Sequence, residues 1–276
     1  MAAIETEGLT KFYGARRGIE DVTVAVEAGE VFAFLGPNGA GKTTTIRTLL
    51  DLLHPSAGSA RIFGLDSHRG SVAIRARLGN LPGDFGYGKR ATGREAIALL
   101  AKLRGIDGLG RAGELARRFR ADLDRPLGEL SRGNRQKVGL ISALFHSPEL
   151  LILDEPTSGL DPLMQEEFLA LVREERERGC AVFLSSHELD EVERVCDRVG
   201  IIRDGALVAV ERVADLLAKT VERRKVEVEF ADPVELERVR AMPGVLAAEY
   251  ARPTLEEVFL TYYRGEHEEE AKEDDG

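Results

Sequence analysis

Long apolar runs, cysteine and an excess of basic charge are all scarce in this chain of 276 residues. Its apolar segments are short, such as Val31–Leu35 and residues 150–153, whereas a transmembrane helix needs roughly 18 consecutive apolar residues. The N-terminal residues do not combine a basic segment with an apolar core, which argues against a secretory signal. We therefore expect a cytosolic protein without a membrane anchor of its own.

Cysteine usage and charge narrow the function classes further. Cys180 and Cys196 are the two cysteines, and without a Cys-x-x-Cys spacing they indicate reduced, structural thiols. No cluster of metal-ligating residues is expected from the sequence. The net charge of −10 is uneven, because residues 266–276 carry seven acidic residues against one lysine (−6), whereas residues 1–220 carry 30 basic against 32 acidic residues (−2). The basic surface typical of nucleic-acid binding is absent.

Short apolar segments alternate with helical patterns through the first 220 residues. Continuous apolar runs of strand length are typical of a parallel sheet covered on both faces. A block of helical periodicity separates the third expected strand from the fourth. The sequence thus predicts an α/β domain over 1–220, with a helical subdomain inserted at about 84–146. The expected strands are 31–35, 60–63, 78–81, 150–153 and 181–185, and the expected helices are 41–53, 94–104, 109–120 and 134–145.

The composition changes after Thr220. Residues 225–230 alternate apolar and charged side chains, as a half-exposed strand does, and Asp232 followed by Pro233 is a helix start. A second strand is expected at 245–250 and a second helix at 254–263, so residues 221–265 form a small α/β C-terminal appendage. The acidic residues 266–276 are expected to be a disordered tail.

A glycine-rich loop carries the first chemical signal. Residues 36–44 read G-P-N-G-A-G-K-T-T, a complete G-x-x-x-x-G-K-T placed between an expected strand and an expected helix. Loop N–H groups and the helix N-terminus bind phosphates, the lysine reaches the β- and γ-phosphates, and the threonine hydroxyl ligates Mg²⁺. The sequence therefore predicts a nucleoside triphosphate site with Mg²⁺. Its residues are Gly36, Pro37, Asn38, Gly39, Ala40, Gly41, Lys42, Thr43 and Thr44.

Two carboxylates follow the apolar strand at 150–153. Asp154 is placed to hold Mg²⁺, directly or through water, and Glu155 to orient and deprotonate an attacking water. A glutamate beside the metal aspartate favours hydrolysis over transfer to a substrate hydroxyl. Asp154 and Thr43 are thus the predicted metal ligands, and Glu155 is the predicted catalytic base.

These motifs, together with four others, resemble the ATP-binding subunits of ABC transporters across nearly the whole chain. L-S-R-G-N-R-Q at 130–136 is similar to the family signature, and S-G-L-D at 158–161 is similar to the loop that follows the catalytic glutamate. His187 resembles the family's switch histidine, and Tyr13, in K-F-Y-G, resembles the aromatic that stacks on adenine. The resemblance implies a P-loop ATPase fold of ABC type.

The family resemblance also implies how ATP is held. Two copies would close head to tail, so that ATP lies between the phosphate loop of one and the signature helix of the other. Ser131, Gly133, Asn134 and Asp161 would complete the site from the second copy. His187 would sense the γ-phosphate, and Tyr13 would stack on the base, with the adjacent Phe12 as the alternative ring.

Two positions depart from the family pattern. Gly83 stands where the family usually has a glutamine, so we expect water or Asp84 to take that coordination position. The signature has Arg132 and Asn134 in place of glycine and glutamine, and Asn134 keeps an amide. Together with the appendage and its P-T-L-E-E-V-F-L segment, these departures resemble the drug- and antibiotic-export branch of the family, in which the membrane subunit is a separate chain.

The resemblance implies an ATP-hydrolysing subunit that powers a transporter, an exporter in this branch. Its partners would be a polytopic membrane subunit and a second ATPase copy, with no nucleic acid, and it would lie on the cytoplasmic face of the membrane. The alternative is a soluble ABC-type ATPase acting on nucleic acid or ribosomes, and such proteins tend to carry two cassettes, coiled-coil inserts or basic extensions. A phosphoryl-transfer kinase is a third class, which Glu155, the signature and His187 disfavour.

Overall fold

The computed structural model describes residues 2–83, 88, 90–219, 236–243 and 245. The chain divides into two units, Met1–Ala218 and Lys219–Gly276. In the second unit, helix α9 (Leu236–Arg240) falls within the helix expected after Asp232 and Pro233. Apart from Val245, the other elements expected in the appendage and the acidic tail lie outside the described residues.

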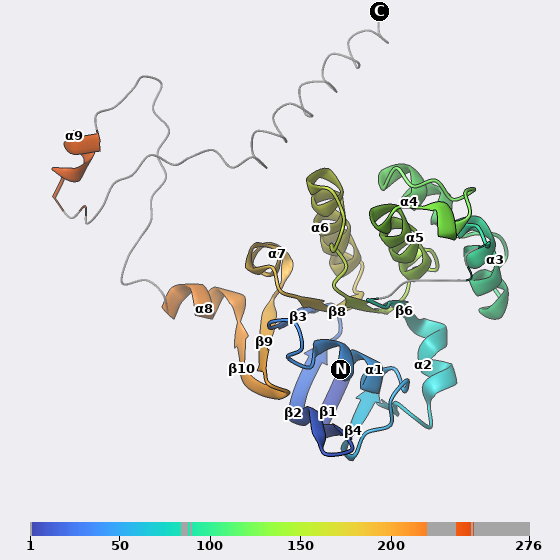
Figure 1. Cartoon of the computed structure of the whole chain (residues 1–276), viewed down its shortest axis with the longest axis horizontal. Coiled ribbons are helices and arrows are strands. Elements are labelled where there is room, and N and C mark those ends of the chain that lie inside the picture. Colours follow the sequence, from blue (N-terminus) through green and yellow to red (C-terminus); the bar gives the residue numbers. More distant parts are fainter. Residues whose placement is uncertain (1, 84–87, 89, 220–235, 244, 246–276) are drawn as a thin grey trace, which may run out of the picture. The chain divides into compact units, whose positions relative to one another are not determined.

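A mixed sheet lies at the centre of the first unit (Figure 1). Five parallel strands lie in the spatial order β9-β3-β8-β7-β6. Strand β10 pairs with the outer edge of β9 in the antiparallel direction. The predicted strands in this sheet are confirmed to within one residue. These are β3 (Val31–Leu35), β6 (Leu78–Leu81), β7 (Leu150–Asp154) and β8 (Ala181–Ser186). The sequence analysis did not predict β9 (Arg198–Arg203) or β10 (Ala206–Arg212).

An antiparallel layer continues this sheet and was mostly missed by the sequence analysis. It contains β1 (Ala2–Tyr13), β2 (Arg16–Glu27), β4 (Ala57–Ile62) and β5 (Leu65–Asp66). Of these, only part of β4 was predicted. A single parallel pairing, between Ala206 of β10 and Glu20 of β2, joins the layer to the mixed sheet.

Helices cover both faces of the parallel strands. Figure 1 shows α3 to α6 on one side and α1 on the other, among β1, β2 and β4. The helices are α1 (Lys42–Leu49), α2 (Ser71–Arg77), α3 (Gly93–Leu103), α4 (Ala112–Arg118), α5 (Arg132–Leu144), α6 (Pro162–Glu177), α7 (Leu189–Val195) and α8 (Val213–Lys219), with a 3₁₀ turn at Leu127–Glu129. Helix α1 ends earlier than predicted, because Asp51 adopts a left-handed backbone conformation (φ 57°).

The core divides between these two faces because successive strand residues point to opposite sides. Val31 and Ala33 of β3 pack in the cluster that includes the apolar side chains of α3 to α7. Phe32 and Phe34 pack in the cluster that includes α1, β1 and β2, and the ring of Phe32 stacks on Phe183 of β8 with centroids 5.7 Å apart. This two-faced burial explains why the parallel strands are continuously apolar.

The helices between β6 and β7 are tied to α6 by ion pairs. Arg118 of α4 donates to Glu167 at 2.5 Å and to Glu174 at 2.6 Å, and Arg111 donates to the buried Glu175 at 2.6 Å. The guanidinium of Arg118 holds the pKa of Glu174 below its ordinary value. These contacts connect α4 to a helix that packs directly on β8.

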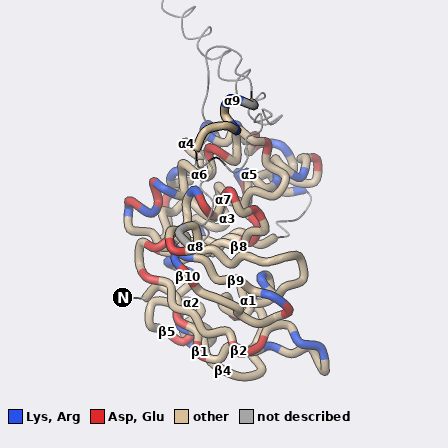
Figure 2. Tube along the Cα trace, turned by 90° about the vertical axis from the view of Figure 1, so that its left-hand side faces the viewer, with Lys and Arg blue, Asp and Glu red and all other residues tan. Residues whose placement is uncertain are grey.

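No helix among the described residues combines the length and apolar character required to cross a membrane. Figure 2 shows acidic and basic residues interspersed along the described trace of the first unit, in agreement with the small net charge of residues 1–220.

Candidate functional site

The predicted phosphate loop connects β3 to α1. Gly39 and Gly41 adopt positive φ angles of 82° and 113°, which favour glycine. A Cβ on Gly41 would lie 2.8 Å from Cγ2 of Ile19, whereas a Cβ on Gly39 would meet nothing within 4 Å. Helix α1 begins without a side-chain cap, so its first N–H groups face the loop and offer an anion site.

Lys42 is the first residue of α1, and its side chain contacts the loop. Its Nζ donates to the carbonyl oxygens of Gly36 at 2.6 Å and of Pro37 at 3.3 Å, and lies 3.5 Å from Oε1 of Glu155. The side chain is 5% exposed. A buried ammonium requires partners of this kind, since an unpaired buried charge is costly. The contacts place one positive charge between the loop and the carboxylate of Glu155, directly after β7.

The two predicted metal ligands lie next to each other. The hydroxyl of Thr43 donates to Oδ2 of Asp154 at 2.8 Å, and the hydroxyl of Ser185 donates to Oδ1 at 2.6 Å. Asp154 and Ser185 are paired across the parallel strands β7 and β8, which explains their alignment. Hydroxyl and carboxylate oxygens are the ligands that Mg²⁺ prefers, so this donor set fits that ion.

Glu155 occupies an unusual backbone position directly after β7. Its φ is 48°, a left-handed value for a non-glycine residue, and its N–H donates to Oγ of Ser185 at 3.0 Å. Its Oε1 lies 3.5 Å from Nδ1 of His187 and 3.5 Å from Nζ of Lys42. Strained backbone conformations of this kind concentrate at functional sites. The fold therefore holds Glu155 between a cation and an imidazole.

Gly83 lies beside the carboxylate of Asp154. A Cβ at this position would stand 3.0 Å from Oδ2 of Asp154, closer than ordinary van der Waals contact. The position that lacks the family's glutamine therefore borders the predicted metal site. Asp84, the suggested replacement, lies outside the described residues, so that expectation stays a prediction.

The signature residues form a second group, beside the loop that follows Glu155. Ser131 caps α5 by accepting from the N–H of Asn134 at 3.3 Å, and Asp161 caps α6 by accepting from Met164 at 3.0 Å. A Cβ on Gly133 would lie 2.4 Å from the carbonyl oxygen of Gly159, so glycine permits this close approach. Asp161 also lies 3.6 Å from Nζ of Lys137 on α5, so the two helix starts are linked to each other.

Gln136 is a residue of this region that sequence reasoning did not single out. Its buried Nε2 donates to the carbonyl oxygens of Glu155 and Pro156, both at 3.0 Å. The signal in the sequence was a long polar side chain on the otherwise apolar face of α5. Through Gln136, the signature helix supports the backbone of the predicted catalytic base.

Tyr13 ends β1 and is 46% exposed. A Cβ on Gly18 would touch both Cε2 of Tyr13, at 2.8 Å, and Cγ2 of Thr44, at 3.1 Å. The ring therefore lies near the start of α1, while Phe12 beside it is less exposed. An exposed ring near the phosphate loop suits stacking, and its role stays a prediction.

Comparisons with known proteins agree with this geometry. A family model described as ABC transporter matches residues 19–158. Over 208 residues the chain is 39% identical to the bacitracin transport ATP-binding protein BcrA of Bacillus licheniformis. The matched region covers 74% of this chain and 68% of that protein. The chain belongs to the ABC transporter family. It is an ATP-binding and ATP-hydrolysing subunit, as the sequence analysis predicted.

Two further ABC relatives extend the match. The Nod factor export ATP-binding protein I of Paraburkholderia xenovorans is 34% identical over 260 residues, covering 92% of this chain and 85% of that one. A solved structure described as an ATP-binding subunit of an ABC transporter superposes with a TM-score of 0.74 at 32% identity, covering 79% of this chain and 93% of that one. The predicted ABC-type P-loop fold is therefore confirmed for this subunit.

Proposed function

We propose that the group formed by Lys42, Thr43, Asp154, Glu155 and His187 is the ATP hydrolysis site of this subunit. Lys42 binds the β- and γ-phosphates, Thr43 and Asp154 hold Mg²⁺, and Glu155 accepts the proton of the attacking water. His187 orients Glu155 from the end of β8. Mg²⁺ would supply charge neutralisation at the phosphates.

One observation carries this assignment. Two neighbouring strands, β7 and β8, and helix α1 deliver their functional side chains to a single point, through the contacts Thr43–Asp154, Asp154–Ser185 and Lys42–Glu155. The hydrogen bond from Ser185 fixes one carboxylate oxygen of Asp154 and leaves Oδ2 facing Thr43. Such outer partners orient metal ligands and tune their affinity.

The second group of residues supports a shared site between two copies. Ser131 caps α5 by accepting from the N–H of Asn134, and a helix start of this kind, with its free N–H groups, suits an anion. In this proposal, Ser131, Gly133, Asn134 and Asp161 of one copy meet the ATP bound to the loop of its partner. A structure described as a dimeric ABC transporter cassette shares this fold, with a TM-score of 0.71 at 22% identity.

Export of a drug- or antibiotic-like compound through a separate membrane subunit is the transport role we propose. Its support lies in the names of the relatives, which include bacitracin transport, daunorubicin/doxorubicin resistance and Nod factor export proteins. The subunit would then act at the cytoplasmic face of the membrane. None of the relatives that we compared favours the soluble alternative acting on nucleic acid.

The test is purification of the full chain from membranes of its own source under mild detergent, followed by identification of what travels with it. We expect a polytopic membrane protein in near-equal amount, released together with this subunit. Recovery in the soluble fraction on ribosomes or RNA, in a form that high salt dissociates, would instead establish the alternative.

A further inference from the structure

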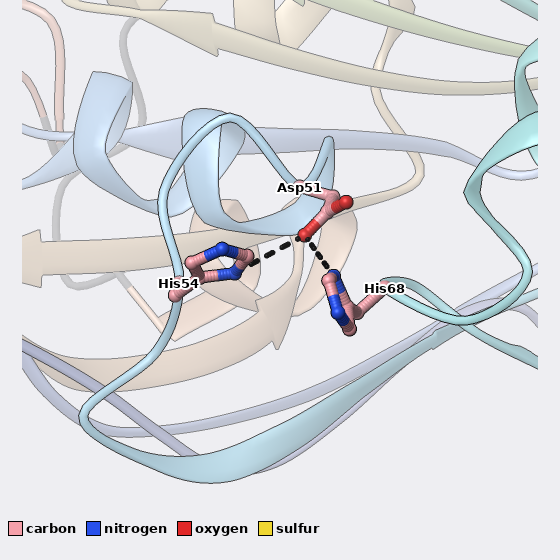
Figure 3. A group of neighbouring side chains, drawn as sticks. All are labelled: Asp51, His54 and His68. Atoms are coloured by element: carbon pink, nitrogen blue, oxygen red, sulfur yellow. Dashed lines mark hydrogen bonds and ion pairs between the residues drawn. The ribbon is translucent and has the colours of Figure 1, made fainter.

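A cluster of two histidines and one aspartate lies apart from the proposed hydrolysis site. Figure 3 shows Asp51, at the end of α1, facing His54 from the following turn and His68 from the loop between β5 and α2. Nδ1 of His68 lies 2.8 Å from Oδ1 of Asp51, and Nδ1 of His54 lies 3.4 Å from the same oxygen. The expectation that the chain has no cluster of metal-ligating side chains is therefore wrong.

The backbone of each member is fixed by separate contacts. Asp51 takes a left-handed conformation that closes α1, and Leu52 completes the closure by donating its N–H to the carbonyl of Arg47 at 2.8 Å. Asp66 accepts from the N–H of His68 at 3.1 Å. The ammonium of Lys11 donates to the carbonyl of His54 at 2.7 Å. The three side chains are thus presented from fixed backbone positions, as a binding site requires.

We infer that Asp51, His54 and His68 bind a divalent transition-metal ion of the Zn²⁺ class. Ligand atoms lie about 2.0–2.2 Å from Zn²⁺, so two ligands are about 3 Å apart at right angles and about 3.4 Å apart at tetrahedral angles. The two separations from Oδ1 span this range, and all three ligand atoms lie within 4.8 Å of one another. Small rotations of two largely exposed imidazoles complete the site.

The two carboxylate oxygens of Asp51 have different partners. The carboxylate is 13% exposed, and Arg75 lies 4.0 Å from its other oxygen, Oδ2, so Oδ1 is left to the histidines. Arg75 also donates to the carbonyl of Leu50 at 3.0 Å. The C-terminal end of a helix carries partial negative charge, so a cation beside the end of α1 is favourable.

The ligand types separate this site from the proposed Mg²⁺ site. Imidazole nitrogens suit Zn²⁺, Ni²⁺, Co²⁺ or Cu²⁺, whereas Mg²⁺ prefers the oxygen donors of Thr43 and Asp154. Water would fill the remaining coordination positions, since the side chains of His54 and His68 are 72% and 63% exposed. The bound ion joins the end of the phosphate-loop helix to the loop before α2. It therefore stabilises the folded chain, because the site does not exist in the unfolded one.

The test uses the untagged full chain, stripped of metal and free of nucleotide, with Mg²⁺ in large excess to occupy oxygen-donor sites. Zn²⁺ is titrated by calorimetry, and Co²⁺ by its visible absorption. Wild type is compared with the double variant His54→Ala/His68→Ala and with Asp51→Asn. His267→Ala, which removes a histidine from the acidic tail, is the matched control.

We expect wild type and His267→Ala to bind one more Zn²⁺ than the double variant does, with a rise in Tm that the double variant lacks. Asp51→Asn should weaken this binding by at least about 10-fold, since loss of even an outer-shell partner costs about 10–100-fold. Equal Zn²⁺ stoichiometry and affinity in wild type and double variant would overturn the proposal. Circular dichroism and ATP binding confirm that the double variant is folded.

Discussion

The hydroxyl of Thr43 donates a 2.8 Å hydrogen bond to Oδ2 of Asp154, 111 positions later in the chain. This contact joins the start of the phosphate-loop helix to the end of β7, so it brings the two proposed Mg²⁺ ligands to one point. Ser185 holds the opposite carboxylate oxygen from β8. The proposed hydrolysis site is therefore a product of parallel strand order rather than of any single motif.

Glu155→Gln should retain ATP binding and lose hydrolysis by about 10²–10⁴-fold, because the amide keeps the shape but cannot accept a proton. The uncleaved ATP should also hold two copies together. Steady-state ATPase assays and size-exclusion chromatography in ATP and Mg²⁺ measure both effects. Glu149→Gln, which removes only an exposed partner of Arg77, is the control. A monomeric Glu155→Gln in ATP contradicts the shared site.

Ser185→Ala should raise the Mg²⁺ concentration needed for half-maximal ATPase activity by about 10–100-fold. The serine hydroxyl donates to Asp154 and accepts from the N–H of Glu155, so its loss loosens both carboxylates. Ser142→Ala is the matched control, because that buried hydroxyl bonds only the carbonyl of Val138 within α5. If both variants keep the wild-type Mg²⁺ dependence, Ser185 does not position the metal ligand.

Gln136→Leu should destabilise the chain by about 1–3 kcal/mol, because the buried carbonyl of Pro156 loses its side-chain donor and the carbonyl of Glu155 keeps only the N–H of Ser158. Turnover should fall as well, since the backbone of Glu155 loses support on the side of α5. Urea unfolding and ATPase assays measure these two effects. Gln165→Leu, on the less buried α6 surface, should change neither. Wild-type stability in Gln136→Leu would show that these hydrogen bonds contribute nothing.

Gly83→Gln should change both the ATPase rate and its dependence on Mg²⁺. A Cβ at this position would stand 3.0 Å from Oδ2 of Asp154, so the carboxylate or the loop must move, and the new amide gains reach to the metal. Gly88→Gln is the control, because a Cβ there meets nothing within 4 Å. If Gly83→Gln keeps both the ATPase activity and the coupling of ATP hydrolysis to transport, this glycine has no special role.

The stability of the folded chain should fall between about pH 6.5 and pH 4, in part through His146. Burial lowers the pKa of this imidazole to about 4, whereas the unfolded chain binds the proton near the ordinary value of 6.5. The unfolded state thus gains protons first, so the stability present above pH 6.5 is lost as pH falls toward 4.

His146→Phe tests this contribution. The variant keeps a ring beside Phe145 and removes the titrating group, so its loss of stability over this window should be about 1–2 kcal/mol smaller than that of wild type, after discounting for partial solvent exposure. Urea unfolding across the pH range measures the difference. Parallel curves for the two proteins would show that His146 does not contribute.

The site motifs could be predicted from the sequence because each depends on residues adjacent in the chain. A glycine-rich loop after a strand, and two carboxylates at the end of another, have a chemistry that spacing alone reveals. The parallel strands were predictable for a similar reason, since burial on both faces makes them continuously apolar. The antiparallel strands β1 and β2 were missed, because half of their side chains face solvent and each contains turn-forming residues such as Gly8 and Asp21.

The sequence by itself determined that this chain binds and hydrolyses ATP, because the phosphate loop and the two carboxylates after β7 are each formed by consecutive residues. Only the tertiary structure decided what surrounds them. Gln136 reaches Glu155 because α5 packs beside the end of β7, and Gly83 borders Asp154 because β6 and β7 are neighbours. His68 meets Asp51, 17 positions earlier, because β4 and β5 fold back toward the end of α1. Such pairs depend on strand order and chain reversal, which local spacing does not encode.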